Sequence, residues 1–300
     1  MDKINTKPNL FIVGAAKSGT TSLHNYLNQH PDIFMCTPKE PHYLINNEIG
    51  QSRILNGVTC KNDYYDLFLD GKKSKYRGES SVMYLMYPEI VIPKINNRFG
   101  KDSKVIIMLR NPIDRAYSGY QHVKRFNSNE NTLDFKAAWN ISEQRYFSNE
   151  SITPASRYQE LGLYYKQVKL YLEKLENVHI IIYDDYLSNI NKEIEKVIDF
   201  LGLKHIKVDT HRNYMVGGWQ WKNQYIKRYI FGRNSFKRMI RHLFPVKSVR
   251  QFLVRFFIKL NKKKVTDISS DDHQMLKLFY KSDVLKLSKL LGRDLKFWIE

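Results

Sequence analysis

A lysine within a loop of small residues is the first group in this chain that could do chemistry. Lys17 follows the apolar run 10–13 and lies in the sequence GAAKSGTTS, residues 14–22. The small residues let the backbone approach a ligand closely, and Gly19 permits a conformation that other residues avoid. The helix expected from residue 20 presents free N–H groups and the positive end of its dipole to an anion. The order of strand, loop and helix therefore predicts a phosphate site with Lys17 as its cation.

The loop differs from the nucleotide-binding P-loop in the position of its lysine. In GxxxxGK[ST] the lysine follows the second glycine, whereas Lys17 precedes Gly19. The ordinary alternative for so short a stretch is a capped strand-to-helix turn that binds nothing. If the loop does bind phosphate, its donors are Lys17, Ser18, Gly19, Thr20, Thr21 and Ser22.

A second candidate phosphate module begins about ninety residues later, in KVIIMLRNPIDRAYSGYQHVKR, residues 104–125. The apolar run 105–109 predicts a buried strand, and Pro112 suits the first position of a helix. Arg110 then lies at the carboxyl end of the strand, and Ser118 lies about two turns into the helix. The two side chains can converge on one phosphate, Arg110 as a charged fork and Ser118 as a neutral donor.

Glu40 and His42 are two titratable residues in a proline-rich stretch. They lie in TPKEPHYL, residues 37–44, where two prolines disfavour a helix and favour a rigid loop. Such a loop can hold both side chains in fixed positions, although most pairs of this kind are simply solvated.

These motifs together resemble those of sulfotransferases that use 3′-phosphoadenosine 5′-phosphosulfate (PAPS). The stretch from Gly14 to Thr21 is similar to their 5′-phosphosulfate loop, and Arg-Asn-Pro-x-x-Arg-x-x-Ser-x-Tyr is similar to their 3′-phosphate motif. The resemblance implies that Lys17 holds the bridging oxygen and the 5′-phosphate, while Arg110 and Ser118 hold the 3′-phosphate. It also implies that Glu40, with His42 as the competing candidate, takes the acceptor proton, and that no metal is required.

The same resemblance assigns two further segments. Glu79 and Ser80 match a short segment that lines the acceptor cleft in glycan sulfotransferases, and residues 211–222 are the candidate for the loop that closes over the co-substrate. The acceptor implied is a glycan, a glycolipid or a small molecule with a hydroxyl or amine. The tail of the chain, LGRDLKFW at 291–298, is similar to the ending of many bacterial members.

The elements that must position these residues alternate along the chain. Apolar runs at 10–13, 105–109 and 178–183 predict buried parallel strands, and a shorter apolar run lies at 33–35. Helical patterns occupy 62–70, 133–146, 155–175, 191–201 and 271–291. We expect an α/β, P-loop-like three-layer fold, with a central parallel sheet flanked by helices and a basic helical C-terminal region. Ligands then bind at the carboxyl ends of the strands. One domain, residues 1–300, accounts for the length.

The net charge of +19 predicts an anionic partner. Residues 222–264 contain fourteen Lys and Arg, interleaved with aromatic residues, and no acidic residue; the apolar residues within 246–260 follow helical spacing. One interpretation is a surface helix with a solvated basic face, and the other is peripheral contact with an anionic membrane. The polar N-terminus and the absence of a long apolar run lead us to expect a cytoplasmic protein.

Two other classes of protein remain as alternatives. A nucleotide kinase would use a similar loop, but with Mg²⁺ and a Walker-B carboxylate, and the position of Lys17 speaks against it. A basic membrane- or nucleic-acid-binding protein would explain the charge but not two separated phosphate modules. We therefore expect PAPS and an acceptor as partners, and no nucleic acid.

Overall fold

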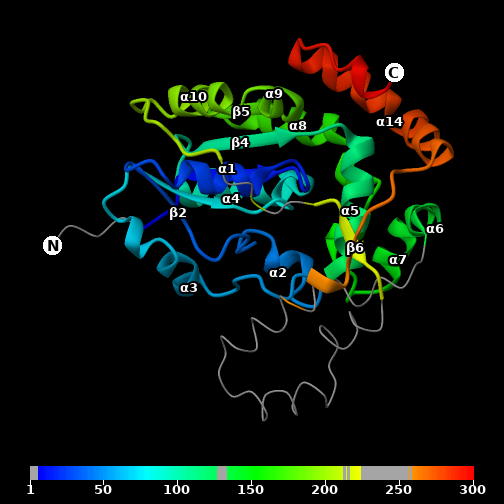
Figure 1. Cartoon of the computed structure of the whole chain (residues 1–300). Helices are drawn as coiled ribbons and strands as arrows, with labels where there is room; N and C mark the ends of the chain where they lie inside the picture. Colours follow the sequence, from blue (N-terminus) through cyan, green and yellow to red (C-terminus); the bar gives the residue numbers. More distant parts are fainter. Residues whose placement is uncertain (1–5, 127–133, 212–213, 215–216, 224–255, 257–258) are drawn as a thin grey trace.

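The computed structural model describes residues 6–126, 134–211, 214, 217–223, 256 and 259–300. Its centre is a parallel sheet of five strands in the order β2-β3-β1-β4-β5 (Figure 1). The strands are β1 (Leu10–Gly14), β2 (Ile33–Met35), β3 (Tyr76–Ser80), β4 (Lys104–Leu109) and β5 (Val178–Ile182). The predicted α/β, P-loop-like fold with a central parallel sheet is confirmed.

Helices cover both faces of the sheet, as the alternation of side chains along β1 requires. Leu10 and Ile12 pack in one cluster with residues of α1 (Thr20–Leu27) and α10 (Ile190–Phe200). Phe11 and Val13 point to the opposite face, where the cluster includes residues of α4, α5, α8 and α14. These four helices are α4 (Pro88–Phe99), α5 (Pro112–Phe126), α8 (Tyr164–Lys174) and α14 (Ser270–Leu291).

Shorter elements complete the described chain. The remaining helices are α2 (Asn46–Ile49), α3 (Lys61–Asp66), α6 (Phe135–Asn140), α7 (Ser142–Ser148) and α9 (Tyr183–Ser188). Single 3₁₀ turns occupy Leu69–Gly71, Tyr84–Met86, Pro154–Ser156, Glu160–Gly162 and Lys296–Trp298. A separate antiparallel ribbon pairs β6 (Trp219–Trp221) with β7 (Lys262–Lys264). It lies beside the lower part of α5 in Figure 1.

The ends of α5 and α14 follow from local sequence. The side chain of Asn111 accepts a hydrogen bond from the N–H of Ile113 at 3.0 Å, and Pro112 occupies the first helical position. The α14 helix starts after Ser269, whose hydroxyl accepts from the N–H of Asp272, and ends at Gly292 in the left-handed conformation. The sequence therefore specifies where α5 begins, which places Arg110 just before it.

The structure differs from the expected elements in three places. Strand β3 was not predicted, because its sequence YRGES has no apolar run, although every residue in it is buried. The helix expected over 155–175 begins only at Tyr164, after two 3₁₀ turns. At the end of the basic segment 222–264, Lys262–Lys264 form an exposed strand rather than a helix. Residues 224–255 and 257–258 of that segment lie outside the described residues.

Candidate active site

The carboxyl edge of the parallel sheet gathers the residues selected from the sequence. Lys17 follows β1, Glu40 and His42 follow β2, and Arg110 follows β4. The end of β3 contributes Glu79 to the same edge. Parallel strands bring their carboxyl ends together, so residues far apart in the chain share one region.

Lys17 is held in the loop that connects β1 to α1. Its Nζ lies 3.5 Å from Nδ1 of His122 on α5, and no carboxylate of the described residues lies within ion-pair distance of it. Burial lowers the pKa of Lys17 to about 8, and the nearby charges of Arg125 and Arg110 contribute to the shift while Glu40 opposes it. A half-buried lysine without a counter-ion fits a site that receives an anion.

Gly19 shapes the start of α1 beside that lysine. Its φ of 89° lies in the left-handed region, and a Cβ at this position would come within 2.9 Å of the Tyr183 ring. Both facts require glycine there. The first turn of α1 contains no acidic residue, so nothing on it repels a phosphate. The other candidate ligands of the loop, Ser18 and Thr20 (buried) and Thr21 and Ser22 (partly exposed), lie at this helix terminus.

Arg110 joins the second motif to the first. Its Nη1 donates to the backbone carbonyl of Lys17 at 3.3 Å, across 93 positions of sequence. Its Nη2 lies 3.5 Å from a carboxylate oxygen of Asp114, and its buried Nε has no hydrogen-bond partner among the described residues. An arginine with an unused buried N–H beside the lysine fits a ligand with several anionic groups.

Ser118 lies two turns further along α5 and is partly exposed. No hydrogen bond joins its side chain to Arg110 in the described structure, so the expected convergence of the two on one phosphate is a proposal about the bound state. The helical spacing does place Ser118 and His122, four residues apart, on one face of α5. Because His122 touches Lys17, that face of the helix points toward the phosphate loop.

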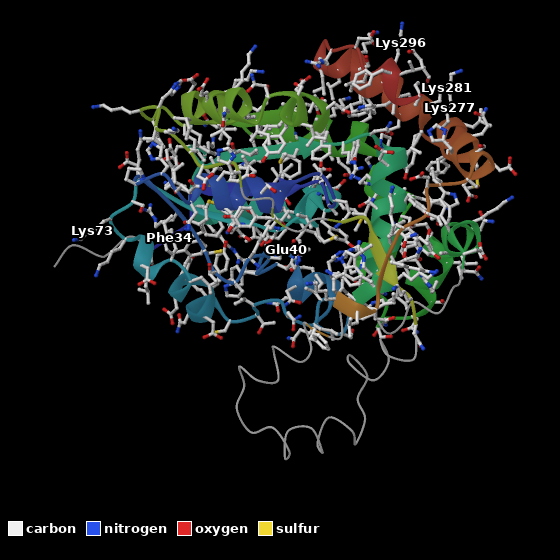
Figure 2. All side chains as sticks on the ribbon, in the orientation of Figure 1. Phe34, Glu40, Lys73, Lys277, Lys281 and Lys296 are labelled. Atoms are coloured by element: carbon white, nitrogen blue, oxygen red, sulfur yellow. The ribbon has the colours of Figure 1, made fainter. Side chains whose placement is uncertain are left out.

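The Glu40 carboxylate is held between two cationic or polar neighbours. Its Oε1 lies 2.7 Å from Nζ of Lys39, and its Oε2 lies 3.4 Å from Nε2 of His42. Burial opposes ionisation, but Lys39 and His42 outweigh it and hold the pKa of Glu40 well below its usual range. Glu40 is therefore ionised, and 39% of its side chain is exposed. Figure 2 labels Glu40 near the centre of the view, whereas Lys73, Lys277, Lys281 and Lys296 lie toward its margins.

Backbone strain marks the same three residues that the sequence selected as catalytic candidates. Among the described residues other than glycine, positive φ angles occur at Lys17 (70°), Glu40 (63°) and His42 (50°). Such conformations cost free energy and persist where the surrounding structure enforces them, often at functional sites. The coincidence supports a shared role for the two loops.

Glu79 is not in the acceptor cleft, and the expectation that it lines the cleft is wrong. It is fully buried, and its carboxylate accepts hydrogen bonds from the hydroxyls of Tyr64, Tyr84 and Ser81. Burial raises the pKa of Glu79, and these three hydroxyl donors limit the rise. The polar side chains of this segment are hydrogen-bonded to other buried groups, so the segment packs beneath the site and does not face a ligand.

Ser80 is also fully buried and does not line the cleft. Its Oγ lies 2.8 Å from Nδ1 of His24 on α1. Burial lowers the pKa of His24 to about 3, and the charge of Lys39 adds to the shift. His24 is therefore a neutral ring that joins the first helix to the end of β3.

Sequence reasoning missed His122 and Lys39, which contact Lys17 and Glu40, and it missed Arg125, whose charge acts on Lys17. His122 could have been found, because it lies four residues beyond Ser118 on the predicted helix. Burial lowers the pKa of His122 to about 4, with contributions from Lys17 and Arg125, so the ring is neutral beside the lysine. Lys39 adjoins Glu40 in the sequence, but only the folded loop shows that its ammonium reaches the carboxylate.

The described part of the expected closing loop reaches the far end of α5. Trp221 is buried and its indole N–H donates to the carbonyl of Arg125 at 3.1 Å. Trp219 packs edge-on against Phe126, with ring centroids 6.2 Å apart. Residues 212–213 and 215–216 of this loop lie outside the described structure, so its role in closure stays a prediction.

Comparison with known proteins agrees with this geometry. A family model described as "Sulfotransferase domain" matches residues 7–242. A crystal structure of a sulfotransferase from Alicyclobacillus acidocaldarius superposes with a TM-score of 0.73 at 28% identity, covering 98% of this chain and 99% of that one.

Curated relatives match over a smaller part of their own length. They include the membrane-associated sulfotransferase kil1 of Dictyostelium discoideum, which is 24% identical over 77% of this chain and 63% of that protein. Human carbohydrate sulfotransferase 15 is 24% identical over 65% and 44%, respectively. Mouse heparan sulfate glucosamine 3-O-sulfotransferase 3B1 is 28% identical over 68% and 48%. The chain thus spans about half the length of these relatives.

Proposed function

The chain belongs to the sulfotransferase family, and we propose that it moves a sulfuryl group from PAPS to a hydroxyl or amine of an acceptor. The observation that carries this proposal is the contact between the two phosphate modules. Arg110 donates to the carbonyl of Lys17 at 3.3 Å, so cations from two distant motifs meet at one place. PAPS, when bound, would supply the sulfuryl group and a phosphate leaving group.

The residues of the loop would bind and orient the 5′ end of that co-substrate. Lys17 is positioned to offset the charge that grows on the bridging oxygen as the S–O bond breaks, and the first turn of α1 would hold the 5′-phosphate with Ser18, Gly19, Thr20, Thr21 and Ser22. Arg110 and Ser118 would hold the 3′-phosphate. Positioning and charge stabilisation are the main requirements of such a transfer.

Glu40 is the better candidate for the general base, although His42 lies beside it. The Nδ1 atom of His42 is buried, and its Nε2 faces the Glu40 carboxylate at 3.4 Å. An acceptor hydroxyl can reach the partly exposed Glu40 more easily than the enclosed ring. Because Lys39 makes the carboxylate a weak base, proton transfer requires Glu40 to leave Lys39 when the acceptor binds.

We propose a carbohydrate acceptor, free or attached to a lipid. The support is the named activity of the relatives, two of which act on carbohydrate or on heparan sulfate glucosamine. Incubation with radiolabelled PAPS and fractionated polysaccharides, glycolipids and small alcohols tests this directly. Label in the small-alcohol fraction alone would contradict it.

Ligand-dependent melting tests the co-substrate without knowledge of the acceptor. Adenosine 3′,5′-bisphosphate (PAP), the product nucleotide, should raise the melting temperature, whereas ATP with Mg²⁺ should raise it much less. A larger shift with ATP and Mg²⁺ would indicate a kinase instead. Loss of the PAP shift in Arg110→Ala would tie the binding to this site.

We also propose that the basic segment 222–264 gives peripheral contact with anionic membranes. None of the helices in the described ranges is both long and apolar enough to span a bilayer. The described end of the basic segment 222–264, Lys262–Lys264, is exposed, and one of the relatives is membrane-associated. Co-sedimentation with anionic and zwitterionic vesicles tests the contact. Binding only the anionic type, with release by salt and by joint replacement of Arg250, Arg255 and Lys259, is the expected result. Failure to bind either type would refute the contact.

A further inference from the structure

The last turn of α5 contains a cation for which the described structure provides no counter-ion. Arg125 is only 4% exposed, and its Nε donates to the carbonyl of Gln121 at 3.1 Å. No carboxylate among the described residues lies within ion-pair distance of its guanidinium. A buried charge is costly unless it is paired. The C-terminal dipole of α5 offsets only about half an elementary charge.

Aromatic rings rather than anions surround this guanidinium. Its carbon lies 5.1 Å from the centroid of the Trp219 ring and 5.6 Å from that of Phe126. The Nζ of Lys262 lies 4.6 Å from the same Trp219 centroid. One indole ring is therefore shared by two cations, and cation–π contacts stabilise such groups without neutralising them.

The position of Arg125 separates it from a purely structural arginine. Arg115, on the same helix, is completely buried and donates to the carbonyl of Tyr158, so no ligand can reach it. Arg125 lies three residues beyond His122 and so shares its face of α5. The His122 ring contacts Lys17 at 3.5 Å and lies 5.0 Å from the Phe126 ring. Arg125 thus lies about one helical turn along α5 from the residue that contacts the phosphate loop.

Arg125 and Lys17 are both cations, and the charge of each disfavours the charged form of the other. Burial lowers the pKa of Arg125, and Arg125 in turn contributes to the lowered pKa of Lys17. A bound oxyanion between them would relieve both effects.

We propose that Arg125, walled by Trp219 and Phe126, is the anchor of an oxyanion-binding site that opens onto the transfer site. The proposal rests on the sulfotransferase function proposed above. The group that it takes is a sulfuryl or carboxyl group, whose paired oxygens match the planar guanidinium fork. Two sources share this chemistry: the sulfuryl group that is transferred, and an acidic group on the acceptor.

Three variants distinguish a specific contact with Arg125 from a non-specific effect of positive charge. Arg125→Gln removes the charge, and Arg125→Lys keeps the charge but loses the fork. Lys124→Gln is the matched control, because it removes one positive charge from the adjacent position, about 100° around the helix. Each variant must first show wild-type affinity for PAP, which contains neither a sulfuryl nor a carboxyl group.

Calorimetry with three probes then locates the oxyanion. The probes are PAPS without acceptor, a chondroitin oligosaccharide added to the PAP complex, and the carboxyl-reduced form of that oligosaccharide. Loss of one charge-assisted contact should weaken binding about tenfold to a hundredfold. If the source is the transferred sulfuryl group, Arg125→Gln weakens PAPS but not PAP. If it is the acceptor, Arg125→Gln weakens only the oligosaccharide with intact carboxylates.

In either case Arg125→Lys should bind the affected probe more tightly than Arg125→Gln does. Lys124→Gln should change the affinity for PAPS and for the oligosaccharide by no more than about twofold. Equal binding of every probe to wild type and Arg125→Gln would overturn the oxyanion site. An equal loss of affinity in Lys124→Gln would also overturn the site. So would weaker binding of PAP by Arg125→Gln than by the wild-type protein. Failure of wild type to bind PAP at all would instead refute the proposed function.

Discussion

The hydroxyl of Ser81 accepts a hydrogen bond from the backbone N–H of His42 at 3.1 Å and donates one to Glu79 at 2.7 Å. The hydroxyl of Tyr84 makes the same link, accepting from the N–H of Leu44 at 3.1 Å and donating to Glu79. Two hydroxyl bridges therefore fix the loop after β2 to one buried carboxylate. The loop that holds the candidate base is positioned from inside the protein.

Glu79→Ala should destabilise the protein, because it leaves the buried hydroxyls of Ser81, Tyr64 and Tyr84 without their acceptor. We expect a loss of roughly 3 kcal/mol, since unsatisfied buried groups cost about 1–3 kcal/mol each and partial relaxation recovers some of it. Thermal unfolding measures the loss. Glu89→Ala, at an exposed position of α4, is the control and should be nearly neutral. Equal melting temperatures for the two variants would contradict the role given to Glu79.

Lys17→Ala should remove most turnover and leave the fold intact. Loss of one such electrostatic contact typically lowers the rate on the order of 10² to 10³. The measurement is the initial rate of transfer from PAPS, together with the circular dichroism spectrum. Activity above a third of the wild-type rate would remove Lys17 from the mechanism.

The lowered pKa of Lys17 predicts an alkaline limit on capture of the co-substrate. In the free enzyme the ammonium loses its proton as pH rises through about 8, so kcat/KM for PAPS should fall above that pH. Lys17→Arg should remove this alkaline fall from the accessible pH range, because arginine stays protonated there. The comparison uses the shape of the pH profile and does not depend on the absolute rate of the variant. An unchanged limb in Lys17→Arg would assign it to another group.

Arg110→Ala and Ser118→Ala should weaken PAP by unequal amounts. A charge-assisted bond contributes roughly 1.5–3 kcal/mol and a neutral one about 1 kcal/mol, so Arg110 should matter more. Adenosine 5′-phosphosulfate, which lacks the 3′-phosphate, is the decisive comparison ligand. Wild type and both variants should bind it almost equally. A persisting defect would mean that these residues contact another part of the nucleotide.

Glu40→Gln should lower kcat by about 10² to 10⁴, the range for loss of a general base, with little change in PAP affinity. Lys39→Gln tests the contact that restrains it. Without Lys39 the pKa of Glu40 should rise toward its ordinary value, so an acid limb in kcat/KM should move to higher pH. Turnover by Glu40→Gln close to wild type, with a defect in His42→Gln instead, would transfer the role to His42.

Much of the fold could be predicted because the relevant signals are local. The apolar runs at β1, β4 and β5 specify buried strands on their own, and Pro112 and Gly292 mark helix boundaries. Strand β3 could not be found in this way. Its residue Arg77 is buried and donates to the carbonyls of Ser74 and Lys7, and the contact with Lys7, 70 residues away in sequence, forms only in the folded chain.

The sequence by itself selected the loops that we propose to bear the chemistry, because the order of small residues, lysine, arginine and prolines is a property of short stretches of chain. Tertiary structure decided which of those residues meet. It placed Arg110 on the carbonyl of Lys17 and His122 beside its ammonium, and it buried Glu79 beneath the site instead of in the cleft. Contact and burial arise from packing between distant segments, so a local pattern can suggest a residue, as helical spacing does for His122, but does not specify its partner.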